Sequence, residues 1–420
     1  MLNFFRSKIK AFLLWSQKYT KTDMLYITKS GFWITLNNGY AIFAGLTTSI
    51  LFANLLSPEN YGVFKYILAL SATISGFSLT AGMNKALIPA FAKGFDGMYK
   101  KAFWVRLKGS LIIPVVAAST AIFYFLHGQT LLGSAMLIIG LFSPFQECVG
   151  IYMPYLSGKK NFKLISIYNI IQTSLYLLTI TAALLLTTQI LVIIFLYFLI
   201  NTAVVSFYYF YTPKIIKLEN NLIDQETFNF AKHLTLINVL TSIANQIDKI
   251  LVFHFLGPAK LAIYAFATKP VDMLSDITKG LLKDISLPKL SAKTIQEIKA
   301  GLTAKMLRLF ILSLMLIIIY IIAVPYVFKL IFPQYLESIK YSQVLSLAII
   351  LTMDVLIAQT FFAHAKKKEL YVVNTANSIT KIVLYLVLLP IYGLWGLVAS
   401  RLAAQGVYFV LLLFLFRRYR

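Results

Sequence analysis

The chain has 420 residues, of which 59% are hydrophobic and only 13% are charged, and its formal net charge is +24 at neutral pH. Soluble domains are about 45–50% apolar, so this composition, with a mean hydropathy of +0.78, excludes an ordinary soluble protein. Nucleic-acid binding, which such a charge would suggest in a soluble chain, is not expected, because membrane proteins concentrate Lys and Arg in their cytoplasmic loops.

The first 29 residues carry basic side chains and a short apolar patch, Phe12–Trp15. This patch is too short for the core of a signal peptide, and no small-residue cleavage site follows it. Two interpretations stay open, an amphipathic segment on the cytoplasmic surface of the membrane and a disordered basic tail.

Twelve apolar stretches then follow along the chain. A helix crosses a bilayer with about 20 residues, so each stretch predicts one membrane span and the chain is expected to be an all-α polytopic membrane protein. The expected spans lie near residues 31–55, 61–84, 107–127, 130–156, 164–187, 190–211, 231–256, 259–282, 307–328, 341–364, 370–390 and 392–416.

The connections between these stretches alternate in charge. One set, which includes both termini, carries nearly all the Lys and Arg that lie outside the spans, whereas the other set carries only Lys260, Lys329 and Lys340. Basic loops remain in the cytoplasm, so the alternation predicts an even number of spans and two cytoplasmic termini.

Two segments 200 residues apart are similar to each other, LFANLLSPENYGVFKY at Leu51–Tyr66 and LVFHFLGPAKLAIYAF at Leu251–Phe266. Without gaps, Pro58 aligns with Pro258, and each proline interrupts the apolar run at the same place. A period near half the chain length predicts two parallel lobes of six spans each, as in many transporters. The expected organisation is a cytoplasmic N-terminal segment 1–29, an N-lobe 30–212, a cytoplasmic loop 213–230 and a C-lobe 231–420.

Charged residues are retained inside several spans, although each costs about 2.5–3.5 kcal/mol at the bilayer centre on insertion scales. They are therefore expected to face a watery cavity or one another. The basic ones are Lys65, Lys249, Lys269, Lys381 and Arg401, and the acidic ones, which could also carry a coupling ion, are Glu147, Asp248, Asp272 and Asp354.

Lys381 and Arg401 have no acidic neighbour on their own spans, so they are the strongest candidates for cations that bind an anion such as phosphate or pyrophosphate. Lys269 with Asp272 could instead form a structural pair. Lys65 and Lys249 could extend to the outer membrane surface.

Amide side chains recur at helical spacing beside these charges. Asn374, Asn377 and Lys381 share one helix face, as do Arg401 and Gln405 with Tyr408. Such amides line a polar cavity, or they join helices without touching a ligand. The expected lining is Asn374, Asn377, Gln405, Asn245, Asn38 and Gln172.

The sequence contains no Walker motif, no Gly-x-Ser-x-Gly motif and no zinc-ligand spacing. We therefore expect no catalytic residues, no metal and no cofactor.

Three short segments resemble one family. The first hairpin, LLSPENYGVFKYILAL, resembles the signature of Wzx-type oligosaccharide flippases, which belong to the multidrug/oligosaccharidyl-lipid/polysaccharide (MOP) exporter superfamily. Gln246–Asp248, followed by Leu256 and Tyr264, is similar to the family pattern in the second half, and LPKLS at Leu287–Ser291 is similar to its motif after the eighth span. Ala262 departs from the pattern, because many members have Gly there.

The resemblance implies two six-helix bundles around a cationic cavity. It implies that the chain moves an undecaprenyl-pyrophosphate-linked oligosaccharide, a unit of O-antigen, capsule or exopolysaccharide, to the outer leaflet of a bacterial cytoplasmic membrane. Alternating access would move it, and the partners would be this glycan lipid, membrane lipid, and polymerase and chain-length proteins of the same pathway. Two alternatives stay open, a cation-coupled multidrug exporter of the same superfamily and a membrane-embedded glycan polymerase or ligase.

Overall fold

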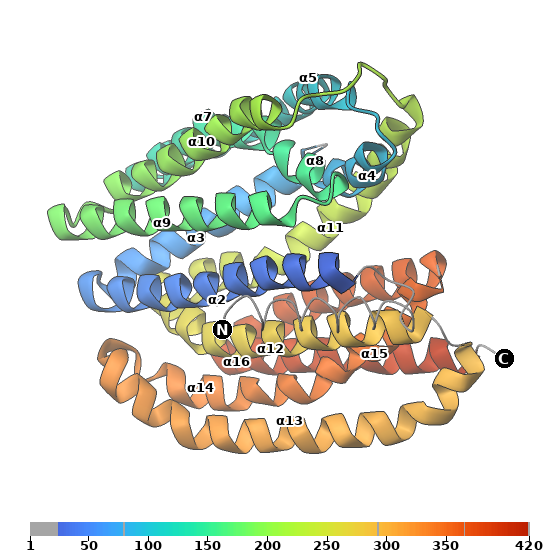
Figure 1. Cartoon of the computed structure of the whole chain (residues 1–420). Helices are drawn as coiled ribbons and strands as arrows, with labels where there is room; N and C mark the ends of the chain where they lie inside the picture. The colour runs from blue at the N-terminus through green and yellow to red at the C-terminus, as the bar shows by residue number, and fades with distance from the viewer. Residues whose placement is uncertain (1–23, 79, 292–293, 365, 419–420) are drawn as a thin grey trace, which may run out of the picture.

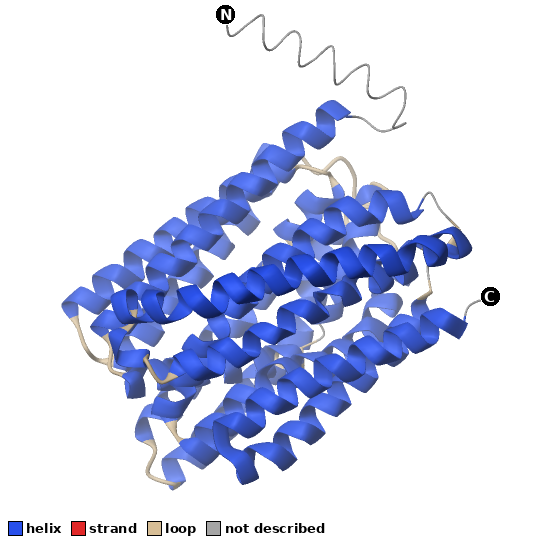
Figure 2. Cartoon of the chain, turned by 90° about the horizontal axis from the view of Figure 1, so that it is seen from below, coloured by secondary structure: helices blue, strands red, loops and turns tan. Residues whose placement is uncertain are grey.

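The computed structural model describes residues 24–78, 80–291, 294–364 and 366–418, and within these ranges every regular element is a helix (Figures 1 and 2). The prediction for segment 1–29 lies outside the described residues up to residue 23, and residues 24–29 belong to the first described helix. The helices are α2 (Met24–Leu55), α3 (Pro58–Gly76), α4 (Thr80–Ala92), α5 (Met98–Ser110), α6 (Ile112–Leu126), α7 (Thr130–Val149), α8 (Tyr152–Gly158), α9 (Phe162–Leu186), α10 (Ile190–Ile215), α11 (Gln225–Leu256), α12 (Pro258–Ser291), α13 (Ile295–Ile331), η1 (Pro333–Tyr335), α14 (Ser338–Leu345), η2 (Ser346–Met353), α15 (Asp354–Ala363) and α16 (Lys367–Arg418).

Each predicted span coincides with one of these helices, with consecutive helices, or with one part of α16. By length and composition, eight segments of the described chain can cross a membrane. The prediction of an all-α polytopic membrane protein is therefore confirmed. The span expected at 107–127 lies within α5 and α6, which begin at Met98, because hydropathy marks where a helix enters the membrane and not where it begins.

Helix α16 is a hairpin that contains the last two predicted spans. Its continuity is broken at Gly393, whose φ of 57° favours glycine because a side chain would be strained there. The Ser400 hydroxyl on the second limb donates to the Leu384 carbonyl on the first, at 3.0 Å. The two limbs therefore run antiparallel, as spans 370–390 and 392–416 require.

The helices lie in two groups (Figure 1). Helices α4, α5, α7, α8, α9 and α10 lie in the upper group of Figure 1, and α12 to α16 lie in the lower group. Helices α3 and α11 connect the groups: α3 packs on α12, and α11 packs on α3, α4 and α16. The division into N-lobe and C-lobe agrees with this packing and stays a prediction in its exact boundaries.

The two similar segments meet where α3 begins beside the beginning of α12. A Cβ atom added at Gly62 would lie 1.9 Å from the Pro258 carbonyl oxygen, so the two backbones touch. The Tyr61 ring lies 4.9 Å from that of Phe266, which in turn lies 3.9 Å from that of Tyr335. These buried rings pack together at the end of the molecule that carries the turns at Pro58 and Pro258.

The same interface continues along α3 through Tyr66. Its ring stacks on Phe253 of α11 at 3.8 Å, and its hydroxyl lies 2.9 Å from Nε2 of His254. Aromatic contacts and one polar contact, rather than ion pairs, thus join the N-lobe to the C-lobe here.

The loop expected at 213–230 includes the end of α10 at Ile215, the beginning of α11 at Gln225 and the non-helical residues between them. The loop is tied to the N-lobe: the Glu219 amide donates to Asp96 at 2.9 Å, and the Asn220 side chain donates to the Gly94 carbonyl at 2.8 Å. At its end Asp224 caps α11, and the hydrogen bond from the Thr227 hydroxyl lowers the pKa of this exposed carboxyl.

Replacing Gly62 by Ala is expected to destabilise the protein by about 1–3 kcal/mol, because the new methyl group overpacks the contact with Pro258. Gly39→Ala is the matched control, since nothing lies within 4 Å of a Cβ atom there and Ala favours the helix. Thermal unfolding of both purified variants measures the difference. Equal midpoints would show that α3 and α12 do not depend on this close approach.

The predicted topology can be tested with single cysteines, because the one native cysteine, Cys148, is buried and can be replaced by serine. Gln129→Cys and Lys101→Cys introduce exposed thiols at opposite ends of the bundle. A membrane-impermeant maleimide should label Gln129→Cys in intact cells and Lys101→Cys only after permeabilisation. The reverse pattern would invert the predicted orientation.

Candidate functional site

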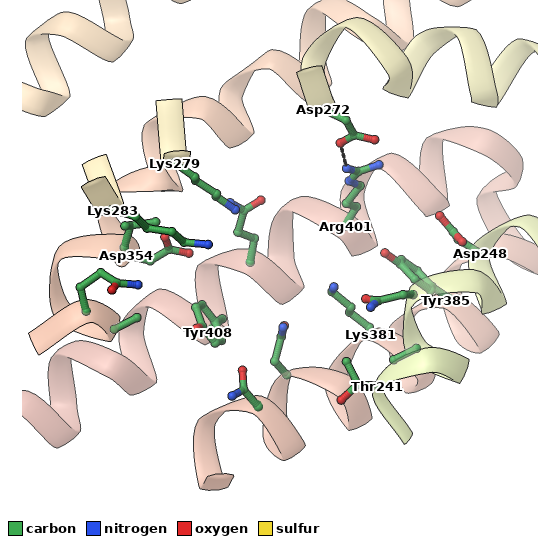
Figure 3. A pocket seen from close by; sticks show the side chains of 18 of the residues that line it. Thr241, Asp248, Asp272, Lys279, Lys283, Asp354, Lys381, Tyr385, Arg401 and Tyr408 are labelled. Atoms are coloured by element: carbon green, nitrogen blue, oxygen red, sulfur yellow. Dashed lines mark hydrogen bonds and ion pairs between the residues drawn. The ribbon is translucent and has the colours of Figure 1, made fainter. Parts of the chain in front are cut away.

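A polar cavity of about 610 Å³ lies within the C-lobe, between α11, α12, α15 and both limbs of α16 (Figure 3). It contains ten of the predicted site residues on its wall, brought together from parts of the chain up to 160 residues apart. They are Asn245, Asp248, Lys249, Asp272, Asp354, Asn374, Asn377, Lys381, Arg401 and Gln405.

Five basic and three acidic side chains line this C-lobe cavity, which leaves an excess of two positive charges. Two of the carboxylates are engaged. Arg401 Nη2 donates to Asp272 Oδ1 (Figure 3), and the Tyr264 hydroxyl donates to Asp248 Oδ2 at 2.9 Å. Arg401, which was predicted to be unpaired, is therefore neutralised by a carboxylate from α12, a partner that no pattern within its own span could reveal.

Lys249 also has local partners. Its ammonium donates to the Gln246 side chain at 2.8 Å and lies 3.7 Å from Asp248. The alternative in which Lys249 extends to the membrane surface does not describe its position, because the side chain turns toward the cavity lining.

Lys381 differs from its neighbours. Within the described part of the chain, its ammonium has no hydrogen bond and no carboxylate within ion-pair distance, although it lines the cavity. Asn377, one turn earlier, has a buried Oδ1 without a hydrogen-bond partner among the described residues. A free cation and a free acceptor on one helix face leave room for a ligand that supplies both an anion and a donor.

A second cavity of about 300 Å³ is lined by α2, α3, α9 and α10 of the N-lobe and, on the side of the C-lobe, by Lys269 of α12; we call it the cavity between the lobes. Lys65 of α3 and Lys269 of α12 both line it, together with the predicted amide Gln172, and no acidic residue is among its described lining. Lys65 lies over the Tyr61 ring, 5.2 Å from its centroid. Lys269 therefore does not pair with Asp272, which faces the other cavity and binds Arg401.

Two predicted site residues lie outside both cavities. Asn38 is exposed on α2 and lines neither cavity. Glu147 of α7 accepts a hydrogen bond from the Thr80 hydroxyl, and the buried Arg106 guanidinium donates to the Glu147 carbonyl oxygen at 3.2 Å. This places Glu147 in a separate charged cluster inside the N-lobe.

Several cavity residues were missed by sequence reasoning. Lys279 and Lys283 of α12 lie at the end of the span expected near 259–282 and were not predicted as site residues, but they line the C-lobe cavity near Asp354 (Figure 3). Their spacing could have identified them as cavity residues, because Asp272, Lys279 and Lys283 lie on one helix face. Arg106 lines neither cavity, and it was missed because the expected span 107–127 began one residue after it.

Among the residues that the structure describes, no group of three or more His, Cys, Asp or Glu side chains could hold a metal ion.

Residues 51–338 match the model of a family described as "Polysaccharide biosynthesis protein". The chain belongs to this family. No sequence among curated proteins matches it.

The fold of the chain is similar to that of several solved structures. It is similar to an inward-facing multidrug resistance MATE family transporter of the MOP superfamily, with a TM-score of 0.68, 14% identity, and coverage of 89% of this chain and 94% of that one. It is also similar to the lipid II flippase MurJ in an inward closed conformation, with a TM-score of 0.64, 15% identity, and coverage of 93% and 87%. A MOP superfamily transporter from Pyrococcus furiosus gives a TM-score of 0.52 at 13% identity, with coverage of 93% and 95%.

At these identities the similarity shows the fold alone. The chain thus has the fold of these three neighbours, which are described as MOP superfamily transporters or, for MurJ, as a lipid II flippase. The resemblance noted in its sequence motifs to that superfamily is confirmed.

The pair formed by Arg401 and Asp272 should give a measurable coupling energy in a double-mutant cycle. Their side chains are 24% and 43% exposed, so solvent screening limits the expected coupling to about 1 kcal/mol. Thermal unfolding of Arg401→Gln, Asp272→Asn and the double variant measures it. Strictly additive effects would contradict the pairing.

Proposed function

We propose that this chain is a flippase that moves an undecaprenyl-pyrophosphate-linked oligosaccharide from the inner to the outer leaflet of a bacterial cytoplasmic membrane. The observation that carries the proposal is the pair of lysines, Lys65 and Lys269, in an acid-free cavity between the lobes. The family description and the transporter fold support the same proposal.

The cavity between the lobes suits a pyrophosphate. Two ammonium groups that share a cavity without a carboxylate repel each other, and a pyrophosphate would neutralise both with charge-assisted hydrogen bonds. Lys65 comes from the N-lobe and Lys269 from the C-lobe, so a bound pyrophosphate would contact both lobes. The lipid tail would remain in the bilayer, since only the polar head needs a cavity.

The C-lobe cavity suits the sugars. Amide and hydroxyl groups bind sugar hydroxyls, and the wall offers Asn245, Asn374, Asn377, Gln405 and Tyr408. Its volume lies within the usual range for ligand pockets, about 300–1,000 Å³. Gln172 would serve the same purpose in the smaller cavity.

Transport would proceed by alternating access, with one lobe rocking against the other. The aromatic contacts around Tyr61, Phe266 and Tyr335 would close the outer end and would separate when the cavity opens outward. The carboxylates Asp248, Asp272, Asp354 and Glu147 are the proposed carriers of a coupling H⁺ or Na⁺. An O-antigen, capsule or exopolysaccharide unit, and polymerase and chain-length proteins as partners, belong to the same proposal.

A cation-coupled multidrug exporter is the main rival, because a MATE transporter is among the similar structures. A cationic drug would be repelled by both cavities, which carry more basic than acidic side chains. A deletion strain that becomes drug-sensitive while its surface glycan stays intact would favour the rival.

A glycan polymerase or ligase would need catalytic groups at the outer end. Two acidic residues lie in connections that the charge alternation predicts at the outer end, Glu59 and Glu337. Glu337 has a structural partner, because it binds the Lys260 ammonium at 2.8 Å, and Glu59 lies in the first turn of α3.

The double variant Lys65→Gln/Lys269→Gln should lower glycan export at least tenfold, because it removes both cations from the proposed pyrophosphate site. Complementation of a deletion strain, with protein levels matched, measures export. Lys101→Gln is the control, since this exposed lysine lies outside both cavities. Arg401 is a poorer choice, because its removal would leave Asp272 unpaired.

Export at the wild-type level in the double variant would overturn the assignment of the pyrophosphate site. Loss of export in Lys101→Gln as well would show that the assay reports a general effect of lost charge.

A further inference from the structure

The two cavities are separate sites, although both contain lysines. No residue lines both of them, and α12 contributes Lys269 to one and Asp272, Lys279 and Lys283 to the other. A single pyrophosphate can therefore neutralise only one group of lysines. If it binds between the lobes, the lysines of the C-lobe cavity still lack an anion.

The excess charge in the C-lobe cavity is concentrated on particular side chains. Arg401 is paired with Asp272, and Lys249 lies near Asp248, so neither is free. The remaining carboxylate of the described lining, Asp354, lies beside Lys279 and Lys283, whereas Lys381 lies apart from it in the same cavity (Figure 3). Three ammonium groups and one carboxylate remain to be balanced.

A neutral sugar would not neutralise the excess positive charge of these ammonium groups. Removing a charge from water without a partner costs several kcal/mol or more, so a neutral glycan that displaced water from these lysines would bind poorly. An anionic substituent would form charge-assisted hydrogen bonds with the lysines, and these bonds would offset the free energy of removing the ammonium groups from water. The C-lobe cavity is therefore expected to bind an anionic glycan more tightly than a neutral glycan of similar size.

The surroundings of Lys381 indicate that the anion belongs to a sugar. Asn374 and Asn377 lie on the same helix face, and the buried Oδ1 of Asn377 has no donor among the described residues. A sugar hydroxyl or an acetamido N–H would supply that donor. Amides beside a free cation form a wall that suits an acidic sugar better than an isolated phosphate ion.

We infer that the transported glycan is acidic, and that a carboxylate or phosphate substituent on one of its sugars binds Lys381, with Lys279 and Lys283 across the C-lobe cavity. This inference rests on the proposed flippase function, in which the pyrophosphate binds Lys65 and Lys269. It assigns the two groups of lysines to two different anions of one substrate.

The test is binding of soluble probes to the purified full-length chain in lipid nanodiscs, measured by titration calorimetry. The probes are inorganic pyrophosphate, a glucuronic acid–N-acetylglucosamine disaccharide, N-acetylglucosamine 6-phosphate and the neutral disaccharide N,N′-diacetylchitobiose. The uronate and the sugar phosphate distinguish the two possible sources of the anionic substituent.

The acidic sugar that matches the substrate should bind at least tenfold more tightly than the neutral disaccharide, since a hydrogen bond to a charged group contributes enough for about that ratio. Lys381→Gln should weaken the acidic sugar about tenfold and leave pyrophosphate within twofold. Lys65→Gln should do the reverse, and Lys101→Gln should change neither. Lys279→Gln provides a second C-lobe variant if Lys381→Gln does not fold.

The outcomes separate the two proposals. If neither acidic sugar binds more tightly than the neutral one, or if no sugar probe binds, the inference of an acidic glycan is overturned, while the flippase proposal stands as long as pyrophosphate binding depends on Lys65. If pyrophosphate binding is unaffected by Lys65→Gln but falls with Lys381→Gln, the assignment of the two anions is overturned.

Discussion

The contact between the beginnings of α3 and α12 is the constraint on which the rest of the structure depends. Gly62 permits the two backbones to touch at Pro258, and the rings of Tyr61, Phe266 and Tyr335 pack around that point. The two lobes are therefore joined at one end of the bundle. Lys65 follows Tyr61 by one helical turn, so the same contact sets how far the first cation lies from the closed end.

This contact consists of apolar side chains and backbone, whereas the cavities are lined by charged side chains. Aromatic rings can separate and be covered again without leaving an uncompensated charge, whereas a broken ion pair in a low-dielectric region would leave two. The charges are placed within the lobes instead, as with Arg401 and Asp272, both of the C-lobe. An arrangement of this kind lets the lobes move without breaking an ion pair such as the one between Arg401 and Asp272.

Much of the fold could be predicted because a bilayer imposes simple rules. Span length and the alternation of basic loops led to twelve spans, and the Gly393 turn shows why one long helix, α16, contains two of them. The similarity of Leu51–Tyr66 to Leu251–Phe266 predicted two lobes, but not that the two segments would face each other. That proximity depends on tertiary packing, which a pairwise alignment of sequence does not contain.

The sequence identified most residues of the candidate site but not which of its charged side chains pair with each other. The polar faces of the spans identified most of the C-lobe cavity, because a charge inside a membrane must face water or a partner. The partner of each charge depends on how the helices pack against one another. Asp272 could be assigned to Lys269 by spacing, yet it binds Arg401, which lies 129 residues away in the sequence. Lys279 and Lys283 were lost because a basic residue near a span end is read as a loop residue.

The division of the lysines follows from that pairing. Once Asp272 and Asp248 are engaged, the C-lobe cavity and the cavity between the lobes each retain unneutralised ammonium groups, and α12 keeps them apart. A ligand that binds both cavities must therefore carry anions at two separated positions, and it contacts both lobes only through the cavity that contains Lys65 and Lys269.

Only interactions that differ between the inward-open and outward-open states can shift the balance between these two states. In the proposed cycle, the contacts of an anion between the lobes would change when the lobes rock, because Lys65 and Lys269 belong to different lobes. An anion held by Lys381, within one lobe, would keep its contacts in both states. The C-lobe cavity would then select the substrate, and the cavity between the lobes would respond to it.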